Sequence, residues 1–498
     1  MSRFGLFAAC LCLACGSLAG QEPAASALPP LSADSAAAIR AELLAPAATQ
    51  GDLALLDRAF RTLHPGLFRY STPDQWNARV DSLRQWLTEP RSRGEVFLAF
   101  SRLVASVRCG HTYLSFWNQS RATRRWLSDA SDKLPFEYAL ATDDRWVVTR
   151  ADTTFARALQ QGDTVTTVQG VQTDRLIAQL LGYIRADGDN DGKRRALLDF
   201  RHRKEYEAID VFLPLLLPPV AGRYVVTVRR PGVSSETTLS LTAMPAALRR
   251  ARAVPVPVAR PPFEVRVDRD VAVLRVDGFD YGTDGNAWAP FVIQTFRMFK
   301  TRRVRQLILD LRENEGGSDE GAEFLLRHLI RTPITLPSLR RYVAYQTVPE
   351  ALRPFLATWD DSFYDRRRTT IAHGDGTFDL KDDGEWPPVI PVSKDAFTGS
   401  VYVLTSYVNS SASHILLRLL QRRTGITLVG DPTGGSQRAQ TGGNLFFLRL
   451  PGTALEVDLP LIAYDWGRDQ PMGGVEPDVR VPAAKALTVA KRLARGGR

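Results

Sequence analysis

A serine stands at the expected start of a helix within the segment Val401–His414. Residues 401–405 are predicted to form a buried strand, and Asn409-Ser410 are residue types that cap helices by accepting hydrogen bonds from free N–H groups. Capping does not require the small residues of Ser411–Ser413, where stronger helix formers would stabilise the helix more. A serine oxygen in the first helical turn lies near the positive end of the helix dipole, which stabilises an alkoxide or a tetrahedral oxyanion. The segment therefore predicts nucleophilic chemistry at a strand end.

Two adjacent glycines, Gly316-Gly317, follow a second apolar run, Leu307–Leu311, after a short charged turn. Adjacent glycines allow the backbone to direct its N–H groups toward a ligand, although a helix-initiating loop explains them equally well. Two more glycine-rich turns follow at residues 429–436 and 473–479. In open α/β sheets the chemistry gathers at the carboxyl ends of strands, so we expect these turns to lie close together.

Taken in order, these segments resemble the carboxyl-terminal-processing, or tail-specific, serine peptidase family. The likeness spans roughly residues 50–485. It rests on Asp-Leu-Arg-x-Asn-x-Gly-Gly at 310–317, Ser-Ala-Ser at 411–413, Val-Gly-x-Pro-Thr-x-Gly at 429–435 and Gly-Val-x-Pro-Asp at 474–478. The resemblance implies an α/β fold with a crotonase-like catalytic core, preceded by a helical N-terminal domain and a PDZ-like β-domain.

The resemblance also implies roles for residues of this chain. Ser411 takes the place of the nucleophile, and the oxyanion hole would use the N–H groups of Ala412 and of Gly317 or its neighbour Gly316. Many members of the family activate the serine with a lysine 25 residues further along. Here that position is Ser436, and no lysine lies between Lys394 and Lys485, so the usual serine–lysine dyad is excluded. Because an unassisted serine is a poor nucleophile, another base is needed.

A histidine supplies that base in the tricorn-like branch of the family, where it comes from the N-terminal helical region. Gly110-His111-Thr112 stands at the matching place. His414 comes one helical turn after Ser411, and its direction along the helix makes proton abstraction from that serine awkward. The remaining histidines are predicted to be structural or exposed: His64, His202, His328 and His373. We therefore predict His111 as the general base.

The group that orients His111 is left open by the sequence. The tricorn-like relay has a serine before the histidine and a distant glutamate, whereas this chain has Gly110 and Pro471 at those places. Asp469 and Glu456 are the candidate orienting residues, and His414 and Ser436 are expected to line the site. No cofactor is predicted, and no metal, because no histidine or cysteine pair has ligand spacing.

Composition excludes several classes of function. The chain has 498 residues, 44% hydrophobic and 24% charged, which is typical of a globular protein with more than one domain. The net charge of +10 comes from scattered arginines, with no run longer than Arg366–Arg368, so nucleic-acid binding is not predicted. No segment after the leader reaches the roughly 18 apolar residues of a membrane span.

The first twenty residues resemble a bacterial-type signal peptide, with Arg3, the apolar run Phe4–Leu13 and the small-residue pattern Ser17–Ala19. This predicts an exported protein, periplasmic or secreted. A lipid anchor at Cys15 is the less favoured alternative. Removal of the leader would leave Cys109 as the only thiol, which excludes an intrachain disulfide.

Hydrophobic periodicity divides the rest of the chain. Residues 21–50 are rich in Ala and Pro and are predicted to form a tether, and three helices are expected in a domain at 51–130. Period-two patterns predict the PDZ-like domain at 131–250, with an insertion at Arg185–Arg203. Alternating strands and helices predict the peptidase core at 260–485.

The favoured interpretation is an exported serine endopeptidase that cleaves peptides or unfolded protein tails. One alternative is a non-catalytic binder of peptides or small apolar ligands on the same fold, as the interphotoreceptor retinoid-binding proteins illustrate within the family. Another is a PDZ-based peptide-binding scaffold whose core is only structural. The absent lysine and glutamate favour the binder, and the presence of Ser411 and His111 favours the enzyme.

Overall fold

The computed structural model describes residues 31–496, except 117, 142, 201–206, 253–261, 280–286, 337–338 and 382–385. The predicted leader at 1–20 and residues 255–261 of the Pro-rich boundary lie outside the described residues. Within the described ranges, no helix is long and apolar enough to cross a membrane.

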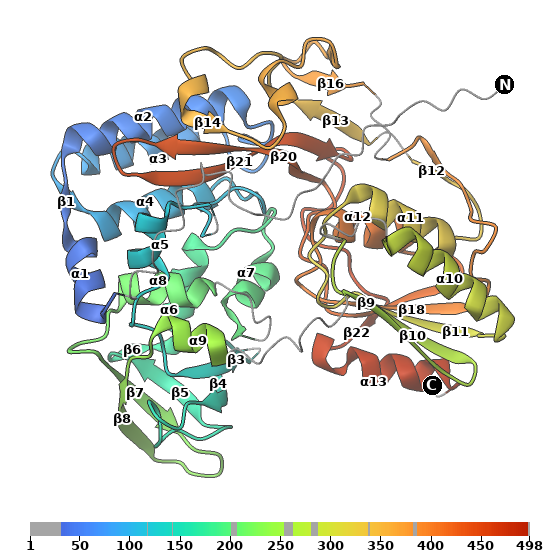
Figure 1. Cartoon of the computed structure of the whole chain (residues 1–498), viewed down its shortest axis with the longest axis horizontal. Coiled ribbons are helices and arrows are strands. Elements are labelled where there is room, and N and C mark those ends of the chain that lie inside the picture. The colour runs from blue at the N-terminus through green and yellow to red at the C-terminus, as the bar shows by residue number, and fades with distance from the viewer. Residues whose placement is uncertain are drawn as a thin grey trace.

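Five helices form the N-terminal part of the molecule (Figure 1). They are α1 (Ala33–Ala41), α2 (Pro46–Leu63), α3 (Pro73–Trp86), α4 (Arg93–Ala105) and α5 (Arg121–Leu127). Apolar residues at three- and four-residue spacings in α2, such as Leu56, Phe60 and Leu63, are fully buried, which confirms the helical period predicted there. Capping boxes begin α3 at Thr72 and α4 at Ser92, so local sequence fixes both helix starts.

The tether predicted at 21–50 is wrong over its described part, because residues 33–41 form α1 and α2 begins at Pro46. The Ala-rich composition that suggested flexibility also favours a helix, and the Ser32 side chain caps α1 by accepting from the Ser35 N–H. Arg40 at the end of α1 is buried, pairs with Asp132 at 2.6 Å and donates to the Trp126 carbonyl. These contacts fix the segment against the next part of the chain.

The middle of the chain forms an antiparallel sheet with the strand order β3-β4-β5-β7-β8. Its elements are β3 (Phe136–Leu140), β4 (Trp146–Ala151), β5 (Thr164–Val168), β6 (Val171–Gln172, paired with β5), α6 (Thr173–Leu180), α7 (Asp191–Leu198), α8 (Ala208–Leu216), β7 (Arg223–Arg229), β8 (Glu236–Thr242) and α9 (Ala246–Arg252). The strands predicted from period-two patterns are confirmed. The predicted insertion at Arg185–Arg203 contains α7, which lies beside the C-terminal part of the molecule (Figure 1).

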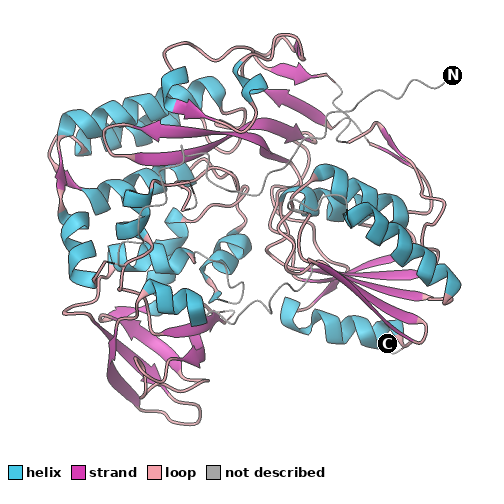
Figure 2. Cartoon of the chain, viewed as in Figure 1, coloured by secondary structure: helices cyan, strands magenta, loops and turns pink. Residues whose placement is uncertain are grey.

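A second six-stranded sheet forms the C-terminal core, with the strand order β22-β19-β18-β11-β10-β9. The strands are β9 (Phe263–Asp268), β10 (Val271–Val276), β11 (Gln306–Asp310), β18 (Ser400–Thr405), β19 (Ile426–Gly430) and β22 (Val479–Arg480). All neighbours are parallel except β9, which is an antiparallel edge strand. The expectation of a mixed α/β fold is confirmed (Figure 2).

Helices cover both faces of this core sheet (Figure 1). One face carries α10 (Trp288–Thr301), α11 (Asp319–Leu329) and α12 (Ser411–Leu420), and the other carries α13 (Ala483–Ala494). The β-branched and aliphatic runs of β11, β18 and β19 are therefore buried on both sides. Their carboxyl ends meet at one edge, which brings together the turns after Asp310, Thr405 and Gly430, as the sequence predicted.

A long hairpin in the C-terminal half of the chain contacts the N-terminal helices. Its strands β20 (Ala439–Leu450) and β21 (Leu455–Asp465) belong to a third sheet ordered β14-β20-β21-β13-β16-β15. The other strands there are β13 (Arg340–Val343), β14 (Leu356–Ala357), β15 (Thr370–Ala372) and β16 (Phe378–Leu380), and β12 (Ile334–Thr335) pairs with β17 (Val389–Ile390). At the hairpin tip, the Gly452 and Thr453 N–H groups donate to the buried Asp52 carboxylate of α2 at 2.9 and 2.6 Å. The hairpin thus lies against the N-terminal helices.

Candidate active site

Ser411 begins α12 directly above the carboxyl end of β18, and its backbone has a φ of +53°. A left-handed conformation is unusual for a residue with a Cβ and costs energy, so the surrounding structure must hold it. The first N–H groups of a helix have no partner within the helix. Ser411 and the Ala412 N–H therefore lie together at the positive end of α12.

Side-chain hydrogen bonds join the turn before Ser411 to the turn that carries the two glycines. Asn409 donates to the carbonyls of Leu311 and Asn314, at 2.6 and 2.9 Å. Ser410 Oγ donates to the Glu315 carbonyl at 3.1 Å. These buried bonds fix the glycine turn relative to the nucleophile candidate, which explains Asn409 and Ser410 better than helix capping, since Ser410 makes no side-chain cap bond.

Gly316 and Gly317 both have a positive φ, +120° and +121°. The Gly316 N–H donates to the Asn314 side-chain oxygen at 2.9 Å, and its carbonyl accepts from the Phe279 N–H at 2.7 Å. Among the described residues, the Gly317 N–H has no acceptor. Of the two glycines proposed as oxyanion donors, Gly317 is thus the one whose N–H group could donate to a ligand.

His111 lies in the loop after α4 and against β20, where a Cβ at Gly442 would be 3.4 Å from His111 Cε1. Burial, together with the positive charges of Arg185 and Lys193, lowers the pKa of His111 to about 4, although the Thr441 carbonyl acts in the opposite direction. The imidazole is therefore neutral at neutral pH, the state that can accept a proton.

His111 and the start of α12 share two charged neighbours. Lys193 and Glu315 both act on the imidazole electrostatically. Lys193 Nζ also donates to Ser410 Oγ at 3.3 Å, and the Glu315 carbonyl accepts from the same hydroxyl. The structure therefore brings His111, from the N-terminal helical part, to the same region as Ser411 and the glycine turn of the core.

Two further residues that were predicted to line the site, His414 and Ser436, are fully buried. His414 Nδ1 is 2.8 Å from Thr433 Oγ1, and burial lowers the pKa of His414 to about 3. Ser436 Oγ accepts from the Tyr70 hydroxyl at 3.0 Å. Both side chains have structural partners, and Ser436 occupies the place of the usual lysine without replacing its chemistry.

The two candidate orienting carboxylates do not come together with His111. Glu456 pairs with Arg449 at 3.2 Å near the tip of the β20–β21 hairpin. Gly442, beside His111, pairs with Ile462, which is six residues or roughly 20 Å along β21 from Glu456. Asp469 is exposed in the loop after β21. Neither position places a carboxylate against the imidazole.

Sequence reasoning missed two residues of α7 that reach the same loops. Asn190 donates to the carbonyls of Thr433 and Gly435 at 2.8 and 3.1 Å. Lys193 Nζ donates to the Val408 carbonyl at 2.9 Å and lies 3.8 Å from Glu315 Oε1. The only available signal was the rarity of lysine, of which the chain has eight.

A strained serine at a helix start, against a glycine turn in which the Gly317 N–H has no acceptor among the described residues, is the arrangement of a serine-type hydrolase. Residues 270–481 match the model of peptidase family S41. Mature CPAF complexed with lactacystin is similar to this chain at 14% identity, with a TM-score of 0.60 over 90% of this chain and 98% of that one. Mature CPAF alone gives 15% identity and a TM-score of 0.58, over 90% and 97%.

A photosystem II D1 C-terminal processing protease also matches, at 15% identity with a TM-score of 0.38, over 87% of this chain and 93% of that one. The two CPAF structures show the fold, and the family model covers the core with the four motifs. The match over residues 270–481 supports a serine peptidase of the S41 type for this core.

Proposed function

We propose that this protein is an exported serine endopeptidase that cleaves peptides or unfolded protein tails, with Ser411 as nucleophile and His111 as general base. Ser411 Oγ attacks the scissile carbonyl carbon while His111 takes its proton. The C–N bond then breaks as His111 returns the proton to the leaving amine, and water activated by the same imidazole releases the acyl group.

The single observation that carries the proposal is the placement of Ser411, at φ +53°, against the Gly316-Gly317 turn. The N–H groups of Gly317 and Ala412 are the oxyanion donors, because Gly316 already donates to Asn314. Fixed backbone donors of this kind stabilise charge that exists only near the transition state.

The base is supported by the neutral state of His111 and by the carbonyl of Thr441, which raises the pKa of the imidazole although Nδ1 has no hydrogen-bond partner among the described residues. A backbone carbonyl can fix the tautomer and the direction of an imidazole, a role that a carboxylate fills in other serine hydrolases. We therefore propose the Thr441 carbonyl as the orienting group, in place of Asp469 or Glu456.

We further propose that the core is crotonase-like and that the sheet β3-β4-β5-β7-β8 is a PDZ-like domain. Support comes from the parallel core sheet and from the five-stranded antiparallel sheet with α6 packed on β5. Export is supported by the leader pattern in the sequence.

A serine-reactive fluorophosphonate tests the proposal directly. The wild-type protein should be labelled at Ser411, and Ser411→Ala should not be labelled while keeping its circular dichroism spectrum. An unlabelled wild-type protein, or equal labelling of the two, would favour the non-catalytic binder instead.

A further inference from the structure

Helix α7 contacts the catalytic loops from outside the core. The side-chain oxygen of its N-cap residue, Asn190, accepts from the Lys193 N–H at 3.0 Å. The side-chain NH₂ of Asn190 donates to the carbonyls of Thr433 and Gly435. Arg194 fixes the preceding loop by donating to the carbonyls of Ile184 and Gly188. The N-terminal turn of α7 is therefore rigidly held against the core.

The packing between α7 and the nucleophile loop leaves no free space. A Cβ at Gly192 would lie 2.1 Å from Cε1 of Tyr407, which is in the turn between β18 and α12. A Cβ at Gly434 would lie 2.9 Å from Cδ of Lys193. Glycine at both positions allows α7 to approach closely enough for the lysine to reach the loop.

Lys193 is buried, and its ammonium group faces three groups of the two catalytic turns. It donates to the Val408 carbonyl at 2.9 Å and to Ser410 Oγ at 3.3 Å, and Glu315 Oε1 lies 3.8 Å away. Burying an ammonium group is costly unless such partners satisfy it. No contact joins Lys193 to Ser411 itself within the described residues, so the geometry does not make this lysine the base.

We propose that Lys193 is a positioning residue for catalysis, which holds Ser410, and through it Ser411 and the Ala412 N–H, in register with the glycine turn. This inference rests on the proposed function. Helix α7 thus helps to position Ser411, although the proposed reacting groups, Ser411 and His111, belong to other parts of the chain. Displacement of about 1 Å at a reacting atom can cost about 10²-fold in rate.

Lys193→Met removes the ammonium group and keeps most of the side-chain volume. We expect kcat for a peptide substrate, and the rate of fluorophosphonate labelling, to fall about 10²-fold while KM stays nearly unchanged. The acid limb of kcat/KM should move to higher pH, because Lys193 and Arg185 are the positive charges acting on His111, with Glu315 opposing them. Lys193→Arg keeps the charge and should leave that limb in place.

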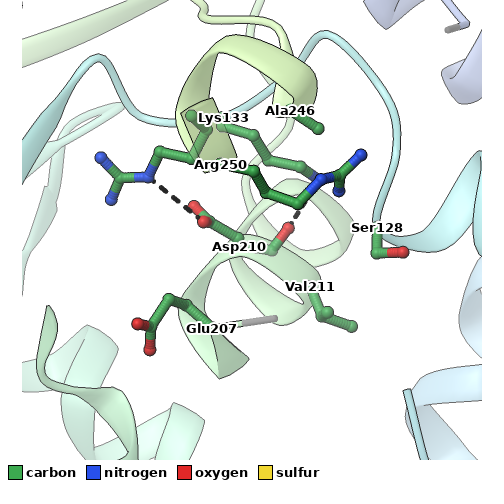
Figure 3. A pocket seen from close by; sticks show the side chains of 8 residues that line it. Ser128, Lys133, Glu207, Asp210, Val211, Ala246 and Arg250 are labelled. Atoms are coloured by element: carbon green, nitrogen blue, oxygen red, sulfur yellow. Dashed lines mark hydrogen bonds and ion pairs between the residues drawn. The ribbon is translucent and has the colours of Figure 1, made fainter. Parts of the chain in front are cut away.

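Lys133→Met is the matched control, because Lys133 is equally buried and bonds to a carbonyl and a carboxylate. Its Nζ donates to the Asp210 carbonyl and pairs with Asp132, both at 2.7 Å. Lys133 lines a polar pocket that contains no residue of the turns at Ser411 and Gly317 (Figure 3). This control should lower the melting temperature and leave kcat unchanged. An equal loss of kcat in both variants would overturn the proposal.

A double-mutant cycle tests whether Lys193 acts through Ser410. The effects of Lys193→Met and Ser410→Ala on kcat should be less than multiplicative when combined. Independent, fully multiplicative effects would contradict the inference. If Lys193→Met fails to fold, Ser410→Ala removes the same hydrogen bond from its other end with Lys193 intact, and wild-type kcat in that variant would contradict the inference as well.

Different results would contradict the proposed function and the proposed role of Lys193. An unlabelled, inactive wild-type protein contradicts the proposed function. An active wild-type protein with an equally active, folded Lys193→Met variant contradicts only the role of Lys193.

Discussion

Ser411 and Gly316 approach each other so closely that a Cβ added to Gly316 would lie 2.7 Å from the Cβ of Ser411. Real side chains do not tolerate such a contact, so Gly316 is required for the two catalytic turns to meet. The sequence motif therefore records a steric requirement at Gly316, and we propose a hydrogen-bonding requirement at Gly317.

Ser411 should be essential for activity, and its left-handed backbone conformation should lower the stability of the fold. Ser411→Ala and Ser411→Gly are each expected to abolish turnover. Ser411→Gly should be more stable than Ser411→Ala by about 1 kcal/mol, because glycine adopts the positive φ of +53° without strain. Urea unfolding of both variants measures this difference, and equal stabilities would show that the backbone at 411 is relaxed.

The acid limb of kcat/KM should be centred near pH 4, well below the ordinary imidazole value of about 6.5, because the pKa of His111 is lowered to about 4. The neutral base exists above this value and is lost as pH falls through it. A pH–rate profile tests this, and His111→Ala should lose most activity, about 10²–10⁴-fold. An unchanged limb in that variant would exclude His111 as its origin.

Gly317→Val should lower kcat by about 10²–10³-fold while an uncleaved peptide still binds with nearly wild-type Kd. The reason is that the oxyanion exists only near the transition state, so a misplaced donor affects catalysis and not ground-state binding. Titration of Ser411→Ala and of Ser411→Ala/Gly317→Val with the same peptide gives the binding comparison. Loss of affinity with retained kcat would make this turn a packing or binding loop.

Stability should fall as pH decreases from about 6.5 toward 3, partly because of buried histidines. Burial lowers the pKa of His64 to about 3, and its Nδ1 accepts from the Gly66 N–H, a bond that protonation would break. A folded-state pKa below the unfolded one gives stability that is complete above the unfolded value and is lost as pH falls. Each such histidine contributes about 1.4 kcal/mol per pH unit in this window.

Urea unfolding at several pH values, for the wild type and His64→Gln, isolates that contribution. The variant should have a shallower dependence of the unfolding free energy on pH. If the two variants show the same dependence of unfolding free energy on pH, the pKa of His64 is not lowered in the folded state.

The sequence allowed much of the core to be predicted because its signals are local. The strand predicted at residues 401–405 is present as β18, Ser400–Thr405, because an apolar run between polar turns defines it. Ser411 and the glycine turn were identified because each motif is contiguous and lies at a strand end.

Contacts between distant segments could not be predicted in the same way. Lys193 and Val408 are 215 residues apart, and α7 has no local pattern that points to the core. The Thr441 carbonyl, which we propose as the orienting group, carries no side-chain signal in the sequence. The tether prediction was wrong because Ala-rich sequence is compatible both with a linker and with the helix at Ala33–Ala41.

The contact between Asp52 and the tip of the β20–β21 hairpin has a kinetic consequence. Its two ends are 400 residues apart, so the N-terminal helices cannot reach their final packing until most of the chain has left the ribosome. The loop that carries His111 rests on the same hairpin at Gly442. Secondary structure can therefore form early during synthesis, while the proposed catalytic centre is complete only near the end, and on this proposal a nascent or truncated chain is inactive.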